Sequence, residues 1–327
     1  MKILELFGGI GACTKALKRL GIDFEVVDYV EIDKYAVNSY NAMNGTQFKP
    51  QDITKWNKDI DVDLIMHGSP CQDFSIAGSQ AGGDENSGTR SSLMYETIRI
   101  VEKLKPKYVI WENVKNVLSK KHKHNFDNYI KLLNELGYNS YYQVLNAKDY
   151  GIPQHRERIF VVSIRKNIDK KFVFPNKIEK CDLVTKFLRL EYSKENYDCC
   201  PNDTPSRRKI WEKNKKIIDE NYTCCDFIST ITTKQDRHPN SGVIFFPNLM
   251  NHKSNFRYLS PRETLLFMGF EDEDYNKISK IVSKQEIYKQ AGNSIVVNVL
   301  EHILKNLLIE KSESKENIQI YTIFDFL

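Results

Sequence analysis

The sequence predicts an α/β fold, in which strands and helices alternate around one sheet, with a second, smaller module. Short apolar runs bounded by turn residues recur and are separated by stretches of helical spacing. The chain opens with a strand-like run that leads through glycines into a helix. Between residues 166 and 256 this alternation fades into a stretch rich in Lys, Asn and Tyr. A chain of 327 residues is long enough to hold one large and one smaller domain.

The first unit is a strand over residues 2–7, a glycine turn and a helix over residues 12–20. Phe7 opens the turn, and Gly9 and Gly11 lie within it. Glycines at such a turn let a nucleotide press against the backbone, where a Cβ atom would collide with it. The dinucleotide fingerprint is incomplete, because Thr14 stands at its third glycine. A nucleotide site and a plain turn both remain open.

The second strand, residues 25–30, ends in Glu31, Ile32 and Asp33. A carboxylate about 20 residues beyond the glycines is placed to accept both hydroxyls of a ribose. Helix N-capping is the alternative, and Asp33 suits that role better than Glu31. Asp52 follows in a turn, where it could accept from an adenine amino group or simply stabilise the turn.

A candidate nucleophile follows the apolar strand at residues 63–66. There Pro70 fixes the backbone just before Cys71, and loops beyond strand ends are where α/β folds do chemistry. A lone cysteine is more often an inert buried residue than a nucleophile. The assignment therefore depends on whether the chain also supplies an acid and a cofactor loop.

A candidate acid, Glu112, ends the strand at residues 108–111, after a helix predicted over residues 92–104. A carboxyl group beside large apolar residues should have a raised pKa, which suits it to hold or deliver a proton near neutrality. A partnered structural glutamate is the alternative interpretation.

A helix over residues 126–136 and a strand over residues 138–145 precede two arginines. Arg156 and Arg158 alternate on entry to the strand at residues 159–162, so we expect their side chains to point the same way. Two guanidinium groups on one face suit a phosphate or a carbonyl oxygen. Solvated arginines are the alternative.

The stretch from residue 166 to residue 256 is interpreted as a module that carries basic and hydrogen-bonding side chains to a polyanion; a solvated insertion is the alternative. Beyond it, Ser260, Pro261 and Glu263 form the pattern of a helix N-terminus with a capping box. A last helix is predicted from residue 295 to residue 308.

Composition narrows the class of protein. Lys and Arg number 48 against 43 Asp and Glu, and the net charge of +5 is compatible with a polyanionic partner without identifying one. No apolar run approaches the length of a membrane span, and the first residues do not resemble a signal peptide. Seven cysteines, an odd number, indicate reduced thiols in the cytoplasm, and we expect no metal site.

Five motifs taken together resemble the DNA (cytosine-5)-methyltransferase family, prokaryotic or phage type. They occur in the family's order and span almost the whole chain: Phe7-Gly8-Gly9-Ile10-Gly11, Pro70-Cys71-Gln72, Glu112-Asn113-Val114, Gln154-x-Arg156-x-Arg158 and Gln290-x-Gly292-Asn293-Ser294. The resemblance implies a Rossmann-like, doubly wound mixed sheet with S-adenosylmethionine as cofactor. It also implies a smaller target-recognition domain, and a last long helix that packs beside the first motif.

The resemblance assigns domains and residues. Residues 1–165 and 288–327 would form the catalytic domain, 166–256 the target-recognition domain and 257–287 a hinge segment. Cys71 would be the nucleophile, Glu112 would contact the cytosine edge and Arg158 its O2, with Arg156 in support. The cofactor pocket would use Phe7, Gly9, Gly11, Glu31, Ile32, Asp52, Pro70 and Asn293. Expected substrate contacts are Gln72, Ser75, Arg90, Thr232 and Arg237.

The resemblance implies an enzyme that flips a cytosine out of double-stranded DNA, adds the cysteine thiolate at C6 and methylates C5. We expect a monomer; whether it works beside a separate restriction endonuclease, in a phage or alone stays open. A tRNA cytosine-5 methyltransferase is the nearest alternative, although residues 222–227 lack the Cys-Phe-Thr stretch of that group. A non-catalytic DNA-binding protein and a nicotinamide-dependent oxidoreductase fit less well.

Overall fold

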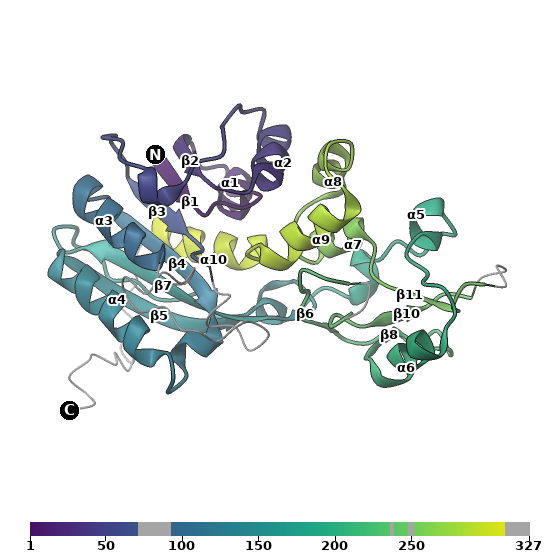
Figure 1. Ribbon diagram of the computed structural model, residues 1–327. Helices are drawn as coiled ribbons and strands as arrows, with labels where there is room; N and C mark the ends of the chain where they lie inside the picture. Colours follow the sequence, from purple (N-terminus) through teal and green to yellow (C-terminus); the bar gives the residue numbers. More distant parts are fainter. Residues whose placement is uncertain (71–92, 236–238, 248–251, 311–327) are drawn as a thin grey trace.

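The computed structural model describes residues 1–70, 93–235, 239–247 and 252–310 (Figure 1). A six-stranded sheet forms its centre, with strand order β2-β1-β3-β4-β7-β5. The first four strands run parallel, and β7 runs antiparallel to both β4 and β5. The strands are β1 (Lys2–Leu6), β2 (Glu25–Val30), β3 (Leu64–His67), β4 (Tyr108–Val114), β5 (Tyr138–Asn146) and β7 (Glu157–Arg165).

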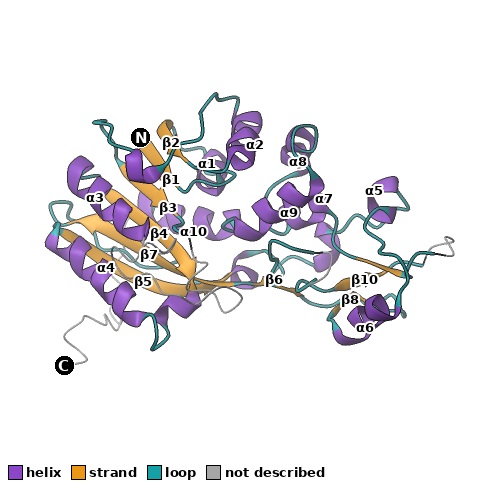
Figure 2. Ribbon diagram, viewed as in Figure 1, coloured by secondary structure: helices purple, strands orange, loops and turns teal. Residues whose placement is uncertain are grey.

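Helices cover both faces of this sheet, which confirms the predicted doubly wound mixed α/β fold (Figure 2). Successive residues of β1 show why: Ile3 packs into the core on one face and Leu4 into the core on the other. α1 (Ala12–Arg19) and α10 (Val297–Leu308) cover the first face, and α10 packs against α1 as the resemblance implied. α3 (Met94–Leu104) and α4 (Lys123–Glu135) cover the second.

A smaller module lies beside the sheet and contains little regular structure, which explains the weak periodicity of its sequence. One link to the larger domain is a pair of two-residue strands, β6 (Gln154–His155) and β9 (Ile228–Ser229), which run parallel. Its own sheet has the order β11-β10-β8. Its other elements are α5 (Lys194–Tyr197), α6 (Pro205–Lys213), β8 (Lys216–Ile218), β10 (Val243–Phe245) and β11 (Phe256–Arg257).

The chain returns to the large domain through helices that begin at the predicted capping box. Ser260 Oγ accepts from the Glu263 backbone N–H at 3.2 Å, and the Glu263 carboxylate accepts from the Ser260 N–H at 2.7 Å. Glu263 also forms a fully buried ion pair with Arg257. The helices are α7 (Pro261–Leu266), α8 (Asp272–Ile278) and α9 (Lys284–Asn293), and α8 packs against α2 (Lys34–Asn44).

Two elements differ from the sequence-based prediction. β4 continues through Val114 because β7 pairs with it as far as Arg158, so Glu112 lies within a strand and not after one. The stretch Gln290–Asn293 forms the end of α9, which ends where Ser294 takes an extended conformation, and α10 begins only at Val297.

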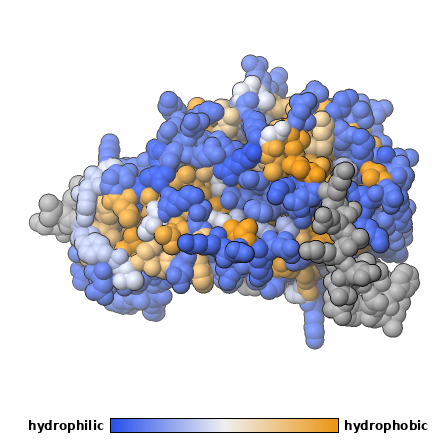
Figure 3. Space-filling model, turned by 180° about the vertical axis from the view of Figure 1, so that it is seen from behind, coloured by the Kyte–Doolittle hydropathy of each residue, from blue (hydrophilic) through white to orange (hydrophobic). Residues whose placement is uncertain are grey.

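The surface opposite to the view of Figure 1 is mostly hydrophilic, with apolar side chains interspersed among polar ones (Figure 3). Within the described ranges, no helix has the length and apolar character needed to cross a membrane.

Candidate active site

The glycine turn after β1 is shaped by backbone geometry and by packing. Phe7 has φ of 51° and Gly11 has φ of 81°, both in the left-handed region. Gly11 precedes α1, and a Cβ atom there would lie 2.7 Å from the Tyr40 ring. Gly9 has φ of 54°, but a Cβ atom there would meet nothing within 4 Å. The Cα of Gly9 therefore faces open space on the side where a Cβ atom would lie, as a turn that a nucleotide presses against requires.

The predicted ribose carboxylate is held by the backbone around it. The two oxygens of Glu31 accept from the N–H groups of Gly9 at 3.1 Å and of Asp33 at 2.9 Å. Burial raises the pKa of Glu31. Asp33 caps α2 by accepting from the Tyr35 N–H at 2.9 Å, the role that the sequence assigned to it. Ile32 between them is 70 % exposed, an uncovered apolar side chain beside the carboxylate.

Asp52 makes the turn contacts that the alternative interpretation expected. Its carboxylate accepts from the Thr54 N–H at 3.0 Å and from the Thr54 hydroxyl at 2.8 Å, and the Thr54 side chain lowers its pKa. Its assignment to an adenine contact stays a prediction.

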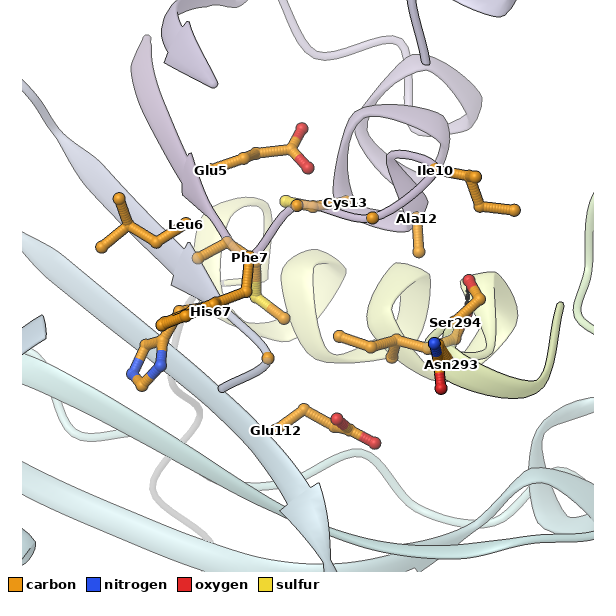
Figure 4. A pocket seen from close by; sticks show the side chains of 15 residues that line it. Glu5, Leu6, Phe7, Ile10, Ala12, Cys13, His67, Glu112, Asn293 and Ser294 are labelled. Carbon is orange, nitrogen blue, oxygen red and sulfur yellow. Dashed lines mark hydrogen bonds between the residues drawn. The ribbon is translucent and has the colours of Figure 1, made fainter. Parts of the chain in front are cut away.

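A pocket lies at the carboxyl ends of β1, β3 and β4 (Figure 4). Four predicted site residues line it together: Phe7 and Gly9 from the first turn, Glu112 from β4 and Asn293 from the end of α9. The five motifs are far apart in sequence, and parts of three of them meet here. The pocket is also lined by residues to which the sequence analysis assigned no site role, among them Glu5, Cys13, His67, Ser294 and Ile295.

Other predicted cofactor residues lie outside the lining of this pocket. Glu31 and Ile32 follow β2, the strand next to β1, and Asp52 lies between α2 and β3, while Gly11 ends the turn and Pro70 follows β3. The side chain of Glu31 accepts a hydrogen bond from the N–H of Gly9, which lines the pocket. Among these residues, and within the described part of the chain, no other side chain is hydrogen-bonded to a lining residue.

Glu112 is buried in this pocket and paired with a cation. It is 8 % exposed, and Arg158 Nε lies 3.2 Å from one of its carboxylate oxygens. Burial raises the pKa of Glu112, and the charges of Arg158 and Arg156 partly offset that rise. Its other oxygen lies 3.6 Å from the position of a Cβ atom built on Gly68. The acid thus lies against the backbone that leads to Pro70 and Cys71.

The two arginines have different partners in the structure. Arg156 is 3 % exposed, and its guanidinium donates to three backbone carbonyls, those of Ile231 at 2.9 Å, Gly292 at 2.9 Å and Ser294 at 2.8 Å. These carbonyls belong to the smaller module and to the end of α9. Arg156 therefore holds the two sides of the site together, and Arg158 is the arginine that faces Glu112.

Gly292, at the end of α9, lies against the backbone of the smaller module with no room for a side chain. A Cβ atom there would lie 2.4 Å from the Thr233 nitrogen and 2.5 Å from the Thr232 carbonyl carbon. The side chain of Thr232 donates to the Lys234 carbonyl at 3.1 Å, so its role as a DNA contact stays a prediction.

Five predicted residues lie outside the described ranges: Cys71, Gln72, Ser75, Arg90 and Arg237. The six described cysteines are free thiols, and burial raises the pKa of each. A raised pKa disfavours the reactive thiolate form of a cysteine. In the described part of the chain no cluster of His, Cys, Asp and Glu could hold a metal.

Comparisons with known proteins show which family this chain resembles. The family model of C-5 cytosine-specific DNA methylases matches residues 1–308. The chain is 42% identical to Type II methyltransferase M2.ScrFI of Lactococcus lactis subsp. cremoris, over 94% of this chain and 99% of that protein. It is 34% identical to Type II methyltransferase M.HhaI of Haemophilus parahaemolyticus, over 94% of each chain.

Solved structures show the same fold. A mutant of Spodoptera frugiperda DNMT2 superposes with a TM-score of 0.74 at 21% identity, covering 94% of this chain and 99% of that one. S. pombe Dnmt2 methyltransferase gives a TM-score of 0.73 at 20% identity, covering 94% and 98%. Since the family model spans nearly every described residue, the chain belongs to the family of C-5 cytosine-specific DNA methylases.

Proposed function

We propose that this protein methylates C5 of cytosine in double-stranded DNA, with Cys71 as the nucleophile and S-adenosylmethionine as the methyl donor. The observation that supports this most directly is the pocket itself. It brings the first glycine turn, the buried acid Glu112 and Asn293 together at the end of the strand that leads to Cys71. The type II methyltransferases to which it is 42% and 34% identical support DNA as the substrate.

The residues around the glycine turn fit this cofactor. Glu31 has a half-buried carboxylate beside Gly9, which suits ribose hydroxyls, and exposed Ile32 offers an apolar surface to a flat base. Phe7 and Asn293 line the pocket where the rest of the cofactor would lie. When bound, S-adenosylmethionine supplies a methyl group on a positively charged sulfur, ready to be taken up by a carbon nucleophile.

Cytosine C5 becomes such a nucleophile only after its ring is activated. The Cys71 thiolate adds to C6, which breaks the aromatic conjugation and places electron density on C5. Glu112 hydrogen-bonds or protonates N3, which neutralises the charge that develops on the ring. Its raised pKa favours the protonated form that such a contact needs. Arg158 lies beside Glu112, and we propose that it contacts the cytosine O2. Loss of the C5 proton and elimination of Cys71 complete the reaction.

The base must leave the duplex for this chemistry, because a stacked base presents neither face to a thiol. Tritiated methyl transfer tests the substrate class. We expect label in long duplex DNA that lacks cytosine methylation and none in tRNA. Label in tRNA alone would replace this proposal with an RNA-modifying activity on the same fold.

A further inference from the structure

Strand β4 presents Glu112 to the pocket and its two neighbours to the opposite face of the sheet. Trp111 belongs to the core under α3 and α4, whereas Glu112 lines the pocket. Side chains alternate along a strand, so Asn113 shares the face of Trp111. Both donate to one residue after β3: Trp111 Nε1 to Ser69 Oγ at 2.9 Å, and Asn113 Nδ2 to the same oxygen at 3.4 Å.

Ser69 is a buried residue two positions before Cys71. It is 4 % exposed, and Asn113 also donates to its backbone carbonyl at 3.4 Å. Pro70 follows it and restricts the backbone further. The indole N–H of Trp111 would be left unsatisfied without this acceptor, since Trp111 is 1 % exposed. Loss of this hydrogen bond would therefore cost folding free energy, which favours its presence in the folded protein.

Trp111 itself is held firmly by aromatic neighbours. Its ring centre lies 4.4 Å from that of Tyr129 and 6.0 Å from that of His67, whose ring is nearly parallel to it. His67 pairs in register with Trp111 across β3 and β4, and its Nε2 lies 2.7 Å from the Tyr129 hydroxyl. Burial lowers the pKa of His67 to about 3, so this contact carries no charge at neutral pH.

We propose that Trp111 is a positioning residue for the reaction: its indole N–H, acting through Ser69, fixes the backbone that leads to Cys71 relative to Glu112. Adjacent residues of β4 thus determine the positions of both groups: Glu112 is the acid, and Trp111 holds the segment before the nucleophile. This inference rests on the proposed function, because it assumes that Cys71 attacks the cytosine. Misplacement of reacting groups by even 1 Å can cost about a hundredfold in rate.

The test uses covalent capture by full-length protein. Duplex DNA in which every cytosine is 5-fluorocytosine contains the target site whatever its sequence, and with S-adenosylmethionine it should trap the protein through Cys71. Trp111→Phe removes the N–H and keeps an aromatic ring. We expect its maximal trapping rate to fall at least about tenfold, with the DNA concentration for half-maximal rate unchanged.

Two further variants make the test specific. Ser69→Ala removes the acceptor with a smaller change of volume, and we expect a similar fall. The double variant should trap no more slowly than Ser69→Ala alone, because that variant already lacks the acceptor of the Trp111 N–H. Trp56→Phe is the matched control: Trp56 is also buried and donates its indole N–H, to Asp28 at 2.7 Å, away from the pocket. We expect it to lower thermal stability and to leave the trapping rate unchanged.

The outcomes separate the two proposals. If wild-type protein forms no adduct, the proposed function fails. If wild-type protein is trapped and Trp111→Phe is trapped as fast as Trp56→Phe, the inference about Trp111 is wrong. Single-variant effects that multiply in the double variant would also overturn it, since they would show that Trp111 and Ser69 act independently.

Discussion

The guanidinium of Arg158 and the buried carboxylate of Glu112 form an ion pair, with Nε and Oε1 3.2 Å apart, on adjacent antiparallel strands; the Arg158 side chain is 18 % exposed. The pairing register of β4 with β7 sets this contact. It places a cation against the acid and still leaves Glu112 with a raised pKa, because burial outweighs the attraction. Such a group is suited to hydrogen-bond a ring nitrogen that gains charge.

Glu112→Gln should lower the rate of methyl transfer at saturating DNA by about a hundredfold, because an amide cannot deliver a proton to N3. Glu157→Gln is the matched control. Glu157 is a neighbouring carboxylate on β7, but it is partly exposed and pairs with Lys115 at 3.1 Å on the surface. We expect full activity from Glu157→Gln; equal rates for the two variants would remove Glu112 from the mechanism.

Stability should fall as pH rises because of Glu5. This carboxyl is 2 % exposed, accepts from Thr14 and lines the pocket. Burial raises the pKa of Glu5 from 4.5 to about 7, with partial offsets from Thr14 and Lys18. The folded state therefore binds the proton more tightly than the unfolded chain. The stabilisation is fully present below the pKa of Glu5 in the unfolded chain and is lost as pH rises through its pKa in the folded protein. The free energy of unfolding should fall by roughly 3 kcal/mol over this range.

Glu5→Gln should remove this dependence. In urea unfolding, the free energy of unfolding of the variant minus that of the wild type should increase between about pH 5 and about pH 8. The difference between the two proteins isolates Glu5 from other titrating groups. A difference that stays constant over this range would show that Glu5 does not change its protonation on unfolding.

Gly292→Ala should weaken the junction between the smaller module and α9. The added Cβ would lie 2.4 Å from the Thr233 backbone nitrogen, which has no flexible side chain to move aside. We expect a loss of about 2 kcal/mol in unfolding free energy and a lower rate of methyl transfer.

Gly45→Ala is the matched control for this change. Gly45 has φ of 69°, but a Cβ atom there would meet nothing within 4 Å. We expect it to cost about 1 kcal/mol through backbone strain and to leave the rate unchanged. If Gly292→Ala behaves like Gly45→Ala, the contact with Thr233 does not determine activity.

Local patterns predicted much of this molecule. The capping box at Ser260 and Glu263 needs only residues three apart, and the strand leading to Glu112 needs only an apolar run. α9 was missed because the apolar residues in Lys284–Asn293 are too few to mark a helical stripe; Ile287 and Ala291 are its buried ones.

The partners of Arg156 could not be predicted from spacing, because its guanidinium binds carbonyls 75, 136 and 138 residues away. The same holds for Ser69, whose donor Trp111 lies 42 residues further along the chain. Glu5 offered a signal, a carboxylate inside an apolar strand, but only the sheet shows that it lines the pocket.

The central claim is that Cys71 forms a covalent bond with cytosine, and trapping on 5-fluorocytosine DNA tests it most directly. With S-adenosylmethionine present, the wild-type protein should become irreversibly attached to this DNA, and mass spectrometry of the digested adduct should place the bond at Cys71. Cys71→Ser should bind the same DNA and form no adduct. Wild-type protein that methylates ordinary DNA without ever being trapped, or a Cys71→Ser variant that is trapped equally well, would contradict the account.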